Sequence, residues 1–164
     1  GAGPAGLFAA LVLARCGARP ILLERGQPVE QRQQDVARFW RAGLLNTESN
    51  VQFGEGGAGA FSDGKLNTGT KDLRHRFIME TLVRCGAPED ILTDAKPHVG
   101  TDMLHIALQA LRRELLAAGA DIRFGARLEG VAAPGRHRPS GRPDLRPARP
   151  SGDTGPGPQR PGHL

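Results

Sequence analysis

Apolar and polar positions along the first 131 residues follow two periods, one typical of helices and one typical of short strands. Residues 4–14 are apolar on nearly all sides, as in a helix that covers a parallel sheet. The apolar run at 20–24 predicts a short buried strand after that helix. Further stripes at helical spacing predict helices at 28–43, 72–86 and 101–119, a short helix starting at 88, and two short strands at 121–124 and 127–131.

Individual residues within these stripes carry structural expectations of their own. Asp72 and Thr101 precede apolar periodic segments and are the expected N-caps of their helices. Trp40 is the only tryptophan and lies on the apolar stripe of its helix, so we expect it to anchor that helix to the core. His105 is expected on the surface of the helix that Thr101 begins.

The first six residues contain the spacing G-x-G-x-x-G, formed by Gly1, Gly3 and Gly6. Gly1 permits a tight turn, Gly3 lets the backbone approach a pyrophosphate, and Gly6 lets the helix pack against a sheet. The helix that begins near Pro4 points free N–H groups and the positive end of its dipole at the phosphates. Glu24 ends the next strand, where a carboxylate accepts hydrogen bonds from ribose hydroxyls. Together these features predict a dinucleotide site in an α/β fold.

A second region rich in glycine lies at 46–70, where Gly54, Gly56, Gly57, Gly59 and Gly64 fall within eleven positions. So many glycines exclude an ordinary helix or strand. Apolar residues interleaved among them indicate that the loop is fixed to a core. Clusters of this kind bring backbone amides close to a ligand, commonly an anion, so we favour a ligand-binding loop over a plain flexible one.

After Ala133 the composition changes, and we expect two parts: a folded domain at 1–133 and a disordered tail at 134–164. The tail contains eight prolines, six glycines and six arginines, and it cannot bury enough surface to order itself. Six arginines against two aspartates carry most of the net charge of +5, so this charge does not predict nucleic-acid binding by the folded part. A shifted reading frame of a high-GC gene gives this composition and is our preferred explanation; a basic tail that binds RNA or acidic lipid is the alternative.

The two cysteines, Cys16 and Cys85, are far apart and form no C-x-x-C pair, which argues against a redox disulfide or a zinc site. Both are expected to be buried thiols near helix ends. No apolar run is long enough to span a bilayer, and no secretory signal is present. These observations favour the cytoplasm, with no membrane and no metal expected.

Several segments together resemble the bacterial FAD-dependent dehydrogenases, a family of NAD(P)/FAD-dependent oxidoreductases with a glutathione-reductase-type, Rossmann-like FAD-binding fold. The segments are GAGPAGLFAALVLA, ERGQPVEQRQQDVARFW, SNVQFGEGGAGAFSDGKLNTG, GAPEDIL and KPHVGTDML. The resemblance covers Gly1 to about Val131 in family order.

This resemblance implies noncovalently bound FAD, with Gly1, Gly3, Ala5 and Gly6 at the pyrophosphate and Glu24 at the adenosine ribose. Gly56 and Gly57 would lie near the phosphates or the ribityl chain, and backbone near Leu128 would touch adenine. The candidate cofactor-binding residues are therefore Gly1, Gly3, Pro4, Ala5, Gly6, Glu24, Arg25, Gly56, Gly57 and Leu128. The implied partners are a small-molecule substrate and NAD(P)H as electron donor, with no nucleic acid and no membrane.

Segments that the family contains at both ends of this region are missing from the sequence. The fold needs a buried strand leading into Gly1, and no such strand and no starting methionine stand in the sequence. The family would also continue beyond Val131 into a substrate domain and a later Gly-Asp segment that completes the flavin site. We therefore expect an N-terminal fragment that by itself holds FAD poorly and does not turn over.

The leading hypothesis is the FAD-binding part of an oxidoreductase. An NAD-dependent dehydrogenase and a nonenzymatic nucleotide-binding module are the alternatives, because the motif alone recognises only the ADP half of either cofactor. Stacking of Trp40 on a flavin is less favoured than a role in the core. No catalytic residue is assigned; the candidates in polar loops, each more often a capping or solvated residue, are Asp63, Lys65, His98 and Asp102.

Overall fold

The computed structural model describes residues 1–66, 72–94 and 97–131, and those between Gly1 and Val131 belong to one compact unit. The predicted tail at 134–164 and the end of the predicted loop at 67–70 lie outside the described residues. The described part is a small mixed α/β structure with four α-helices, two 3-10 turns and a two-stranded sheet. The elements are α1 (Pro4–Arg15), β1 (Ile21–Leu23), α2 (Val29–Ala42), η1 (Ala58–Phe61), α3 (Arg74–Arg84), η2 (Glu89–Leu92), α4 (Thr101–Ala117) and β2 (Asp121–Arg123).

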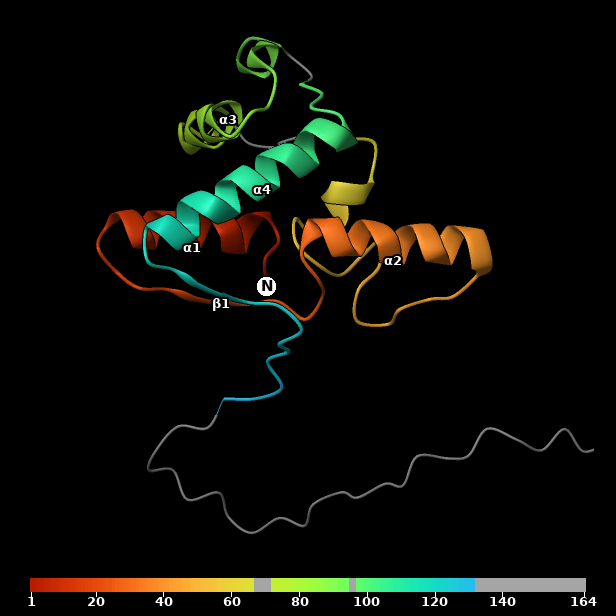
Figure 1. Cartoon of the computed structure of the whole chain (residues 1–164). Coiled ribbons are helices and arrows are strands. Elements are labelled where there is room, and N and C mark those ends of the chain that lie inside the picture. Colours follow the sequence, from red (N-terminus) through yellow and green to blue (C-terminus); the bar gives the residue numbers. More distant parts are fainter. Residues whose placement is uncertain (67–71, 95–96, 132–164) are drawn as a thin grey trace, which may run out of the picture. The chain divides into compact units, whose positions relative to one another are not determined.

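The sheet is formed by β1 and β2, which run parallel with Leu22 opposite Ile122. Hydrogen bonds continue the pairing past the strands, because the Glu24 amide donates to the Arg123 carbonyl at 2.8 Å and the Ala126 amide donates to the Glu24 carbonyl at 2.9 Å. Parallel strands need a long crossover connection, and here that connection includes α4. Figure 1 shows α1 and α4 on the same side of the two strands.

The helices follow the predicted stripes. α1 begins with Pro4 at its first position, and α2 ends at Gly43 in the left-handed conformation, as predicted. The prediction for Asp72 is off by one residue: Leu73 is the N-cap of α3, and the Asp72 carboxylate accepts a hydrogen bond of 2.8 Å from the amide of Arg74, the first helical residue. The prediction for Thr101 is off by one residue: Gly100 is the N-cap of α4 and Thr101 is its first helical residue.

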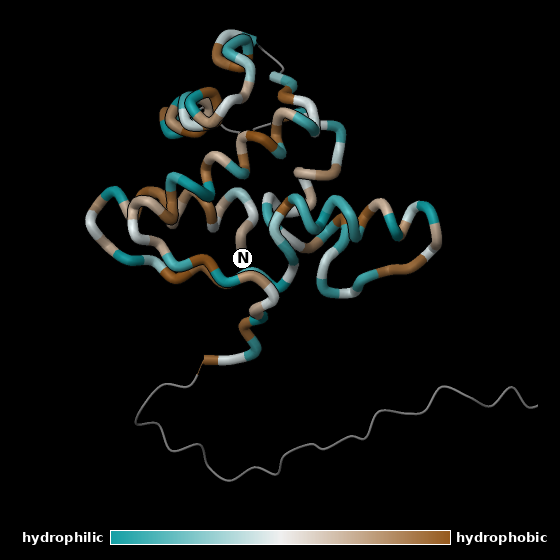
Figure 2. Tube along the Cα trace, in the orientation of Figure 1, coloured by the Kyte–Doolittle hydropathy of each residue, from teal (hydrophilic) through white to brown (hydrophobic). Residues whose placement is uncertain are grey.

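The core lies where α1, α3 and α4 face one another, and it is built from leucines at helical spacing: Leu7, Leu11, Leu82, Leu108, Leu111 and Leu115. In Figure 2 the hydrophobic colour also marks the strand β1 and the chain just after α2. The latter contains Leu44 and Leu45, which are exposed together with Trp40.

Three further expectations are wrong within the described part. Residues 127–131 form no strand, since they are exposed and the ladder ends at Ala126. Trp40 is 69% exposed because it lies in the last turn of α2, beyond the buried residues of that helix, which lie between Val29 and Val36. His105 is buried because its ring packs on Phe61 and its Nε2 reaches the Ala60 carbonyl at 2.7 Å.

The cysteines differ from each other. Cys85 is buried, as predicted, whereas Cys16 is exposed because it caps the open C-terminal end of α1. Both are free thiols. Among the helices described, none has the length and apolar character needed to cross a bilayer.

Candidate functional site

The glycine motif forms a tight approach between the chain at Gly1 and the first turn of α1. A Cβ atom at Gly6 would lie 1.9 Å from the Gly1 carbonyl oxygen and 3.3 Å from the Leu22 side chain on β1. No side chain fits in that space, so only glycine allows α1 to start so close to the strand. This is the close packing for which the motif requires its third glycine.

The N-terminus of α1 presents open backbone donors. The first intrahelical bond runs from the Leu7 amide to the Gly3 carbonyl at 3.0 Å. The amides of Ala5 and Gly6 come before it and have no acceptor within the helix. Pro4 and Ala5 are exposed, so the first turn of α1, with the positive end of the helix dipole, is accessible from outside. Such a helix start is suited to a negatively charged group.

Glu24 connects the end of β1 to the glycine turn. Its Oε2 accepts a hydrogen bond from the Ala2 amide at 2.7 Å, and its Oε1 accepts one from the Gly26 amide at 2.8 Å. The side chain is only 5% exposed. A carboxylate has about four lone-pair positions, so about two remain for further donors. The sequence did not predict these two backbone bonds, which give Glu24 a structural role beside any role in binding.

Glu24 lines a cavity of about 350 Å³, which we name the Glu24 pocket. Five of the predicted cofactor-binding residues, far apart in the sequence, meet there, whereas Gly3, Pro4, Ala5, Gly6 and Gly56 do not line it. The full lining is Gly1, Leu23, Glu24, Arg25, Gln52, Phe53, Gly54, Gly57, Ala126, Arg127 and Leu128.

Arg25 and Phe53 form one wall of this pocket. The Arg25 guanidinium lies 3.9 Å from the centroid of the Phe53 ring and donates two hydrogen bonds of 3.1 Å to the Glu48 carboxylate. The hydrogen bonds to Glu48 thus hold the Arg25 guanidinium over the Phe53 ring, in a cation–π contact. Leu128 is 65% exposed and supplies apolar surface to the same pocket from the chain after β2.

The sequence predicts that the amides of the loop glycines are open to a ligand, but the amides of Gly56 and Gly57 are bonded within the chain. The Gly56 amide donates to the Ala2 carbonyl at 2.8 Å, and the Gly57 amide donates to the Gly54 carbonyl at 3.0 Å. A Cβ at Gly56 would meet the Leu108 side chain at 2.4 Å, so Gly56 faces the core and lines a separate apolar cavity of about 120 Å³. Gly57 lies against the start of α1, where a Cβ would be 3.4 Å from Gly3 Cα and from Pro4 Cδ.

Sequence reasoning missed a buried polar network behind the pocket. Arg32 and Glu55 are both fully buried, and Glu55 Oε2 accepts hydrogen bonds of 2.8 Å from the Val29 amide and from Arg112. Burial raises the pKa of the Glu55 carboxyl, although the Val29 amide and Arg112 act against this. Burial also lowers the pKa of Arg32 to about 10, with Glu24 and Glu55 acting in the opposite direction. The available signal was the position of Arg32 on the apolar stripe between Val29 and Val36.

The catalytic candidates lie elsewhere. Asp63 and Lys65 form an exposed ion pair of 2.7 Å, and His98 Nε2 lies 2.6 Å from the Asp63 carbonyl oxygen. The neighbouring Lys65 ammonium lowers the pKa of the Asp63 carboxyl. Asp102 is exposed in the first turn of α4, and none of the four lines the Glu24 pocket. Within the ranges described, no three metal-ligating side chains gather at one place.

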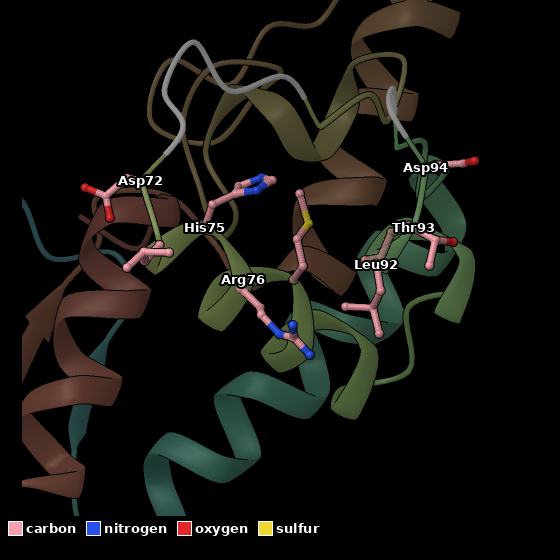
Figure 3. Close-up of a pocket in the computed structure, with 9 residues that line it drawn as sticks. Asp72, His75, Arg76, Leu92, Thr93 and Asp94 are labelled. Atoms are coloured by element: carbon pink, nitrogen blue, oxygen red, sulfur yellow. The ribbon is translucent and has the colours of Figure 1, made fainter.

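A larger cavity of about 660 Å³ lies between α3 and η2 (Figure 3). It contains none of the predicted site residues. Two of its charged side chains are already paired, Asp72 with Arg74 and Arg76 with Glu80. We therefore place the candidate site at the Glu24 pocket.

Comparison with known proteins adds one relative. An uncharacterized protein of Clostridium beijerinckii is 52% identical to this chain over 131 residues, which are 80% of this chain and 25% of the relative. The chain therefore spans about a quarter of the length of that protein. No family model matches the chain.

Proposed function

We propose that this chain forms the Rossmann-like, adenine-dinucleotide-binding part of an FAD-dependent oxidoreductase. The observation that supports this most is the Glu24 pocket, which joins the glycine turn, the acid at the end of β1, the glycine loop and the chain after β2. In a dinucleotide site the same parts have separate tasks, since the helix start binds phosphate and the acid binds ribose.

The residues present fit the ADP half of such a cofactor. The space at Gly6 leaves no room for a Cβ, and the amides of Ala5 and Gly6 have no acceptor within the helix and can donate to a pyrophosphate. The remaining lone pairs of Glu24 can accept hydrogen bonds from ribose hydroxyls. The volume of about 350 Å³ is within the range of small-molecule sites.

Each part of the site then has a function in binding. Glu24 orients the ribose and repels a 2′-phosphate, which disfavours NADP here. Phe53 and Leu128 offer apolar surface to the base, and the Arg25 guanidinium offers a cation that can lie against the base. When bound, FAD supplies the hydride or electron chemistry, and the protein supplies position and electrostatics.

The proposal extends to partners and compartment. A small-molecule substrate with NAD(P)H as electron donor follows from the resemblance stated above. The free thiols Cys16 and Cys85 support a reducing compartment such as the cytoplasm.

Titration of the 164-residue chain with ADP tests this function. We expect ADP to bind, adenosine 2′,5′-bisphosphate to bind more weakly, and Glu24→Gln to weaken ADP binding by about tenfold, as for a lost hydrogen bond to a charged group. Glu89→Gln, an exposed acid far from the pocket in sequence, is the matched control and should bind ADP normally. Absence of ADP binding by the unaltered chain would overturn the proposal.

Competition then separates the cofactors. The chain by itself is expected to hold FAD only weakly, but FAD should still displace ADP more effectively than NAD does, and bound FAD should give absorbance bands in the near-ultraviolet and blue. Displacement by NAD but not by FAD would assign the site to a nicotinamide dinucleotide instead. If neither FAD nor NAD displaces ADP, the flavin proposal is contradicted, and a nonenzymatic nucleotide-binding module becomes the favoured function.

A further inference from the structure

Arg32 is a fully buried cation whose partners are backbone carbonyls. Its Nε donates to the Asn50 carbonyl at 2.8 Å, and its Nη2 donates to the Val51 carbonyl at 2.9 Å. Its Nη1 donates to the carbonyls of Glu55 at 2.7 Å and Gly57 at 2.8 Å. Four of its five N–H groups are therefore engaged with one loop.

The geometry of this loop is built around the guanidinium. A Cβ at Gly54 would lie 2.4 Å from Arg32 Cδ, and Gly54 has a φ of +128°, which disfavours any other residue. A Cβ at Gly26 would lie 2.5 Å from the Gly54 Cα, so the turn after β1 presses on the loop from the other side. The loop therefore passes through a narrow space between α2 and the Glu24 strand.

The burial of Arg32 is not explained by an ion pair with a carboxylate. Among the described residues, no carboxylate oxygen lies within 4.0 Å of the Arg32 guanidinium. The Phe61 ring lies 4.5 Å from it and contributes a cation–π contact. A buried charge without a direct counter-ion is costly unless its hydrogen bonds are satisfied, and the loop carbonyls satisfy them.

The same loop forms a wall of the Glu24 pocket through Gln52, Phe53, Gly54 and Gly57. We infer that Arg32 is the positioning residue of this pocket: its planar guanidinium fixes residues 50–57 in the conformation that binds the nucleotide. The identity of the ligand in this inference rests on the proposed function. The effect of Arg32 on the conformation of the loop does not depend on that function. A lysine cannot replace it, because one ammonium does not present a planar fork to four carbonyls.

Amide hydrogen exchange tests the effect on the loop without any ligand. In the unaltered chain the amides of Glu55, Gly56 and Gly57 are hydrogen-bonded and should be protected. In Arg32→Lys they should exchange at least about tenfold faster, while amides in α4 keep their protection. Arg41→Met, an exposed arginine of the same helix, is the control and should change neither. Equal protection of the loop in Arg32→Lys, or equal loss in the loop and in α4, would overturn the inference.

Gly54→Ala is a second variant that leaves the cation in place. The added Cβ must displace the Arg32 side chain or the loop, so it should also speed exchange at Glu55 to Gly57. Unchanged exchange in this variant would contradict the tight fit between Gly54 and Arg32.

ADP titration tests the effect on the site. Arg32→Lys and Gly54→Ala should each weaken ADP binding by about tenfold, the effect of losing one hydrogen bond to a charged group. In Arg32→Ala, millimolar ethylguanidinium should restore loop protection and ADP binding, whereas ethylammonium should not. A loosened loop with unchanged ADP affinity would overturn the positioning role. Failure of the unaltered chain to bind ADP would instead refute the proposed function, and the exchange data would still report on the loop.

Discussion

The Oε2 atom of Glu24 accepts a hydrogen bond from the Ala2 amide at 2.7 Å, which ties the end of β1 to the turn that begins α1. The other oxygen of the same carboxylate accepts from the Gly26 amide at 2.8 Å. One buried side chain thus holds two backbone segments that line the pocket. Its contribution to stability is separable from its contribution to binding.

The first prediction concerns that stability. Glu24→Ala leaves two buried amides without an acceptor, and we expect it to lower the free energy of unfolding by about 2–4 kcal/mol. Glu24→Gln keeps one acceptor oxygen and should fall between the Ala variant and the unaltered chain. Urea denaturation measures the series, and an Ala variant as stable as the unaltered chain would contradict the buried bonds.

The second prediction concerns Gly6. In Gly6→Ala the new methyl group would lie 1.9 Å from the Gly1 carbonyl oxygen, so α1 or the turn must shift. Overpacking of this kind costs about 1–3 kcal/mol, occasionally more. Gly59→Ala is the matched control, because a Cβ there meets nothing within 4 Å. Thermal unfolding compares the two, and equal stability of both variants would refute the close approach at Gly6.

The sequence predicted the elements whose periodicity is strong and whose ends carry glycine or proline. α1, α2 and β1 follow from apolar spacing, and Glu24 follows from its place after Leu23. The strand predicted at 127–131 failed because short apolar runs do not specify pairing, and pairing depends on a partner far away in the chain.

Buried polar residues were beyond sequence reasoning for a different reason. Arg32 and His105 would normally be solvated, and their burial depends on carbonyls supplied by the loops at 50–57 and 58–61. The separation of Gly56 from the pocket also depends on tertiary packing, here against Leu108. Composition and spacing carry no information on such partners.

The third prediction addresses Trp40. Because its side chain is 69% exposed, Trp40→Ser should change the free energy of unfolding by less than about 0.5 kcal/mol. Val36→Ala, on the buried face of the same helix, should cost about 2 kcal/mol. Circular dichroism during urea denaturation reports on both. A large loss in Trp40→Ser would restore the sequence-based expectation that this residue anchors α2.

The fourth prediction addresses Glu114, which is partly exposed. Burial raises the pKa of its carboxyl, but hydrogen bonds from Arg15 and Arg84 outweigh this, so that the pKa lies below its ordinary value of 4.5. The resulting stability is present above that value and is lost as the pH falls through the lower pKa. Because solvent screens the network, Glu114→Gln should cost only about 0.5–1 kcal/mol at neutral pH. The difference from the unaltered chain should shrink in acid and in high salt; a constant difference would contradict the ion-pair origin.

The fifth prediction concerns Glu55, whose titration acts in the opposite direction. Burial raises its pKa above the ordinary value of 4.5, so the folded chain keeps this proton at a pH where the unfolded chain has released it. The folded state then binds more protons than the unfolded state, and stability falls as the pH rises from 4.5 through the raised pKa.

Glu55→Gln removes this titration while it keeps the shape of the side chain. The free energy of unfolding of the unaltered chain, minus that of Glu55→Gln, should therefore decrease as the pH rises from acid to neutral values. Glu89→Gln is the control, since that acid is exposed and the corresponding difference should stay flat. Urea denaturation across the pH range measures both. A difference that grows with pH would mean that the pairing of Glu55 with Arg112 at 2.8 Å outweighs the cost of burying the charge.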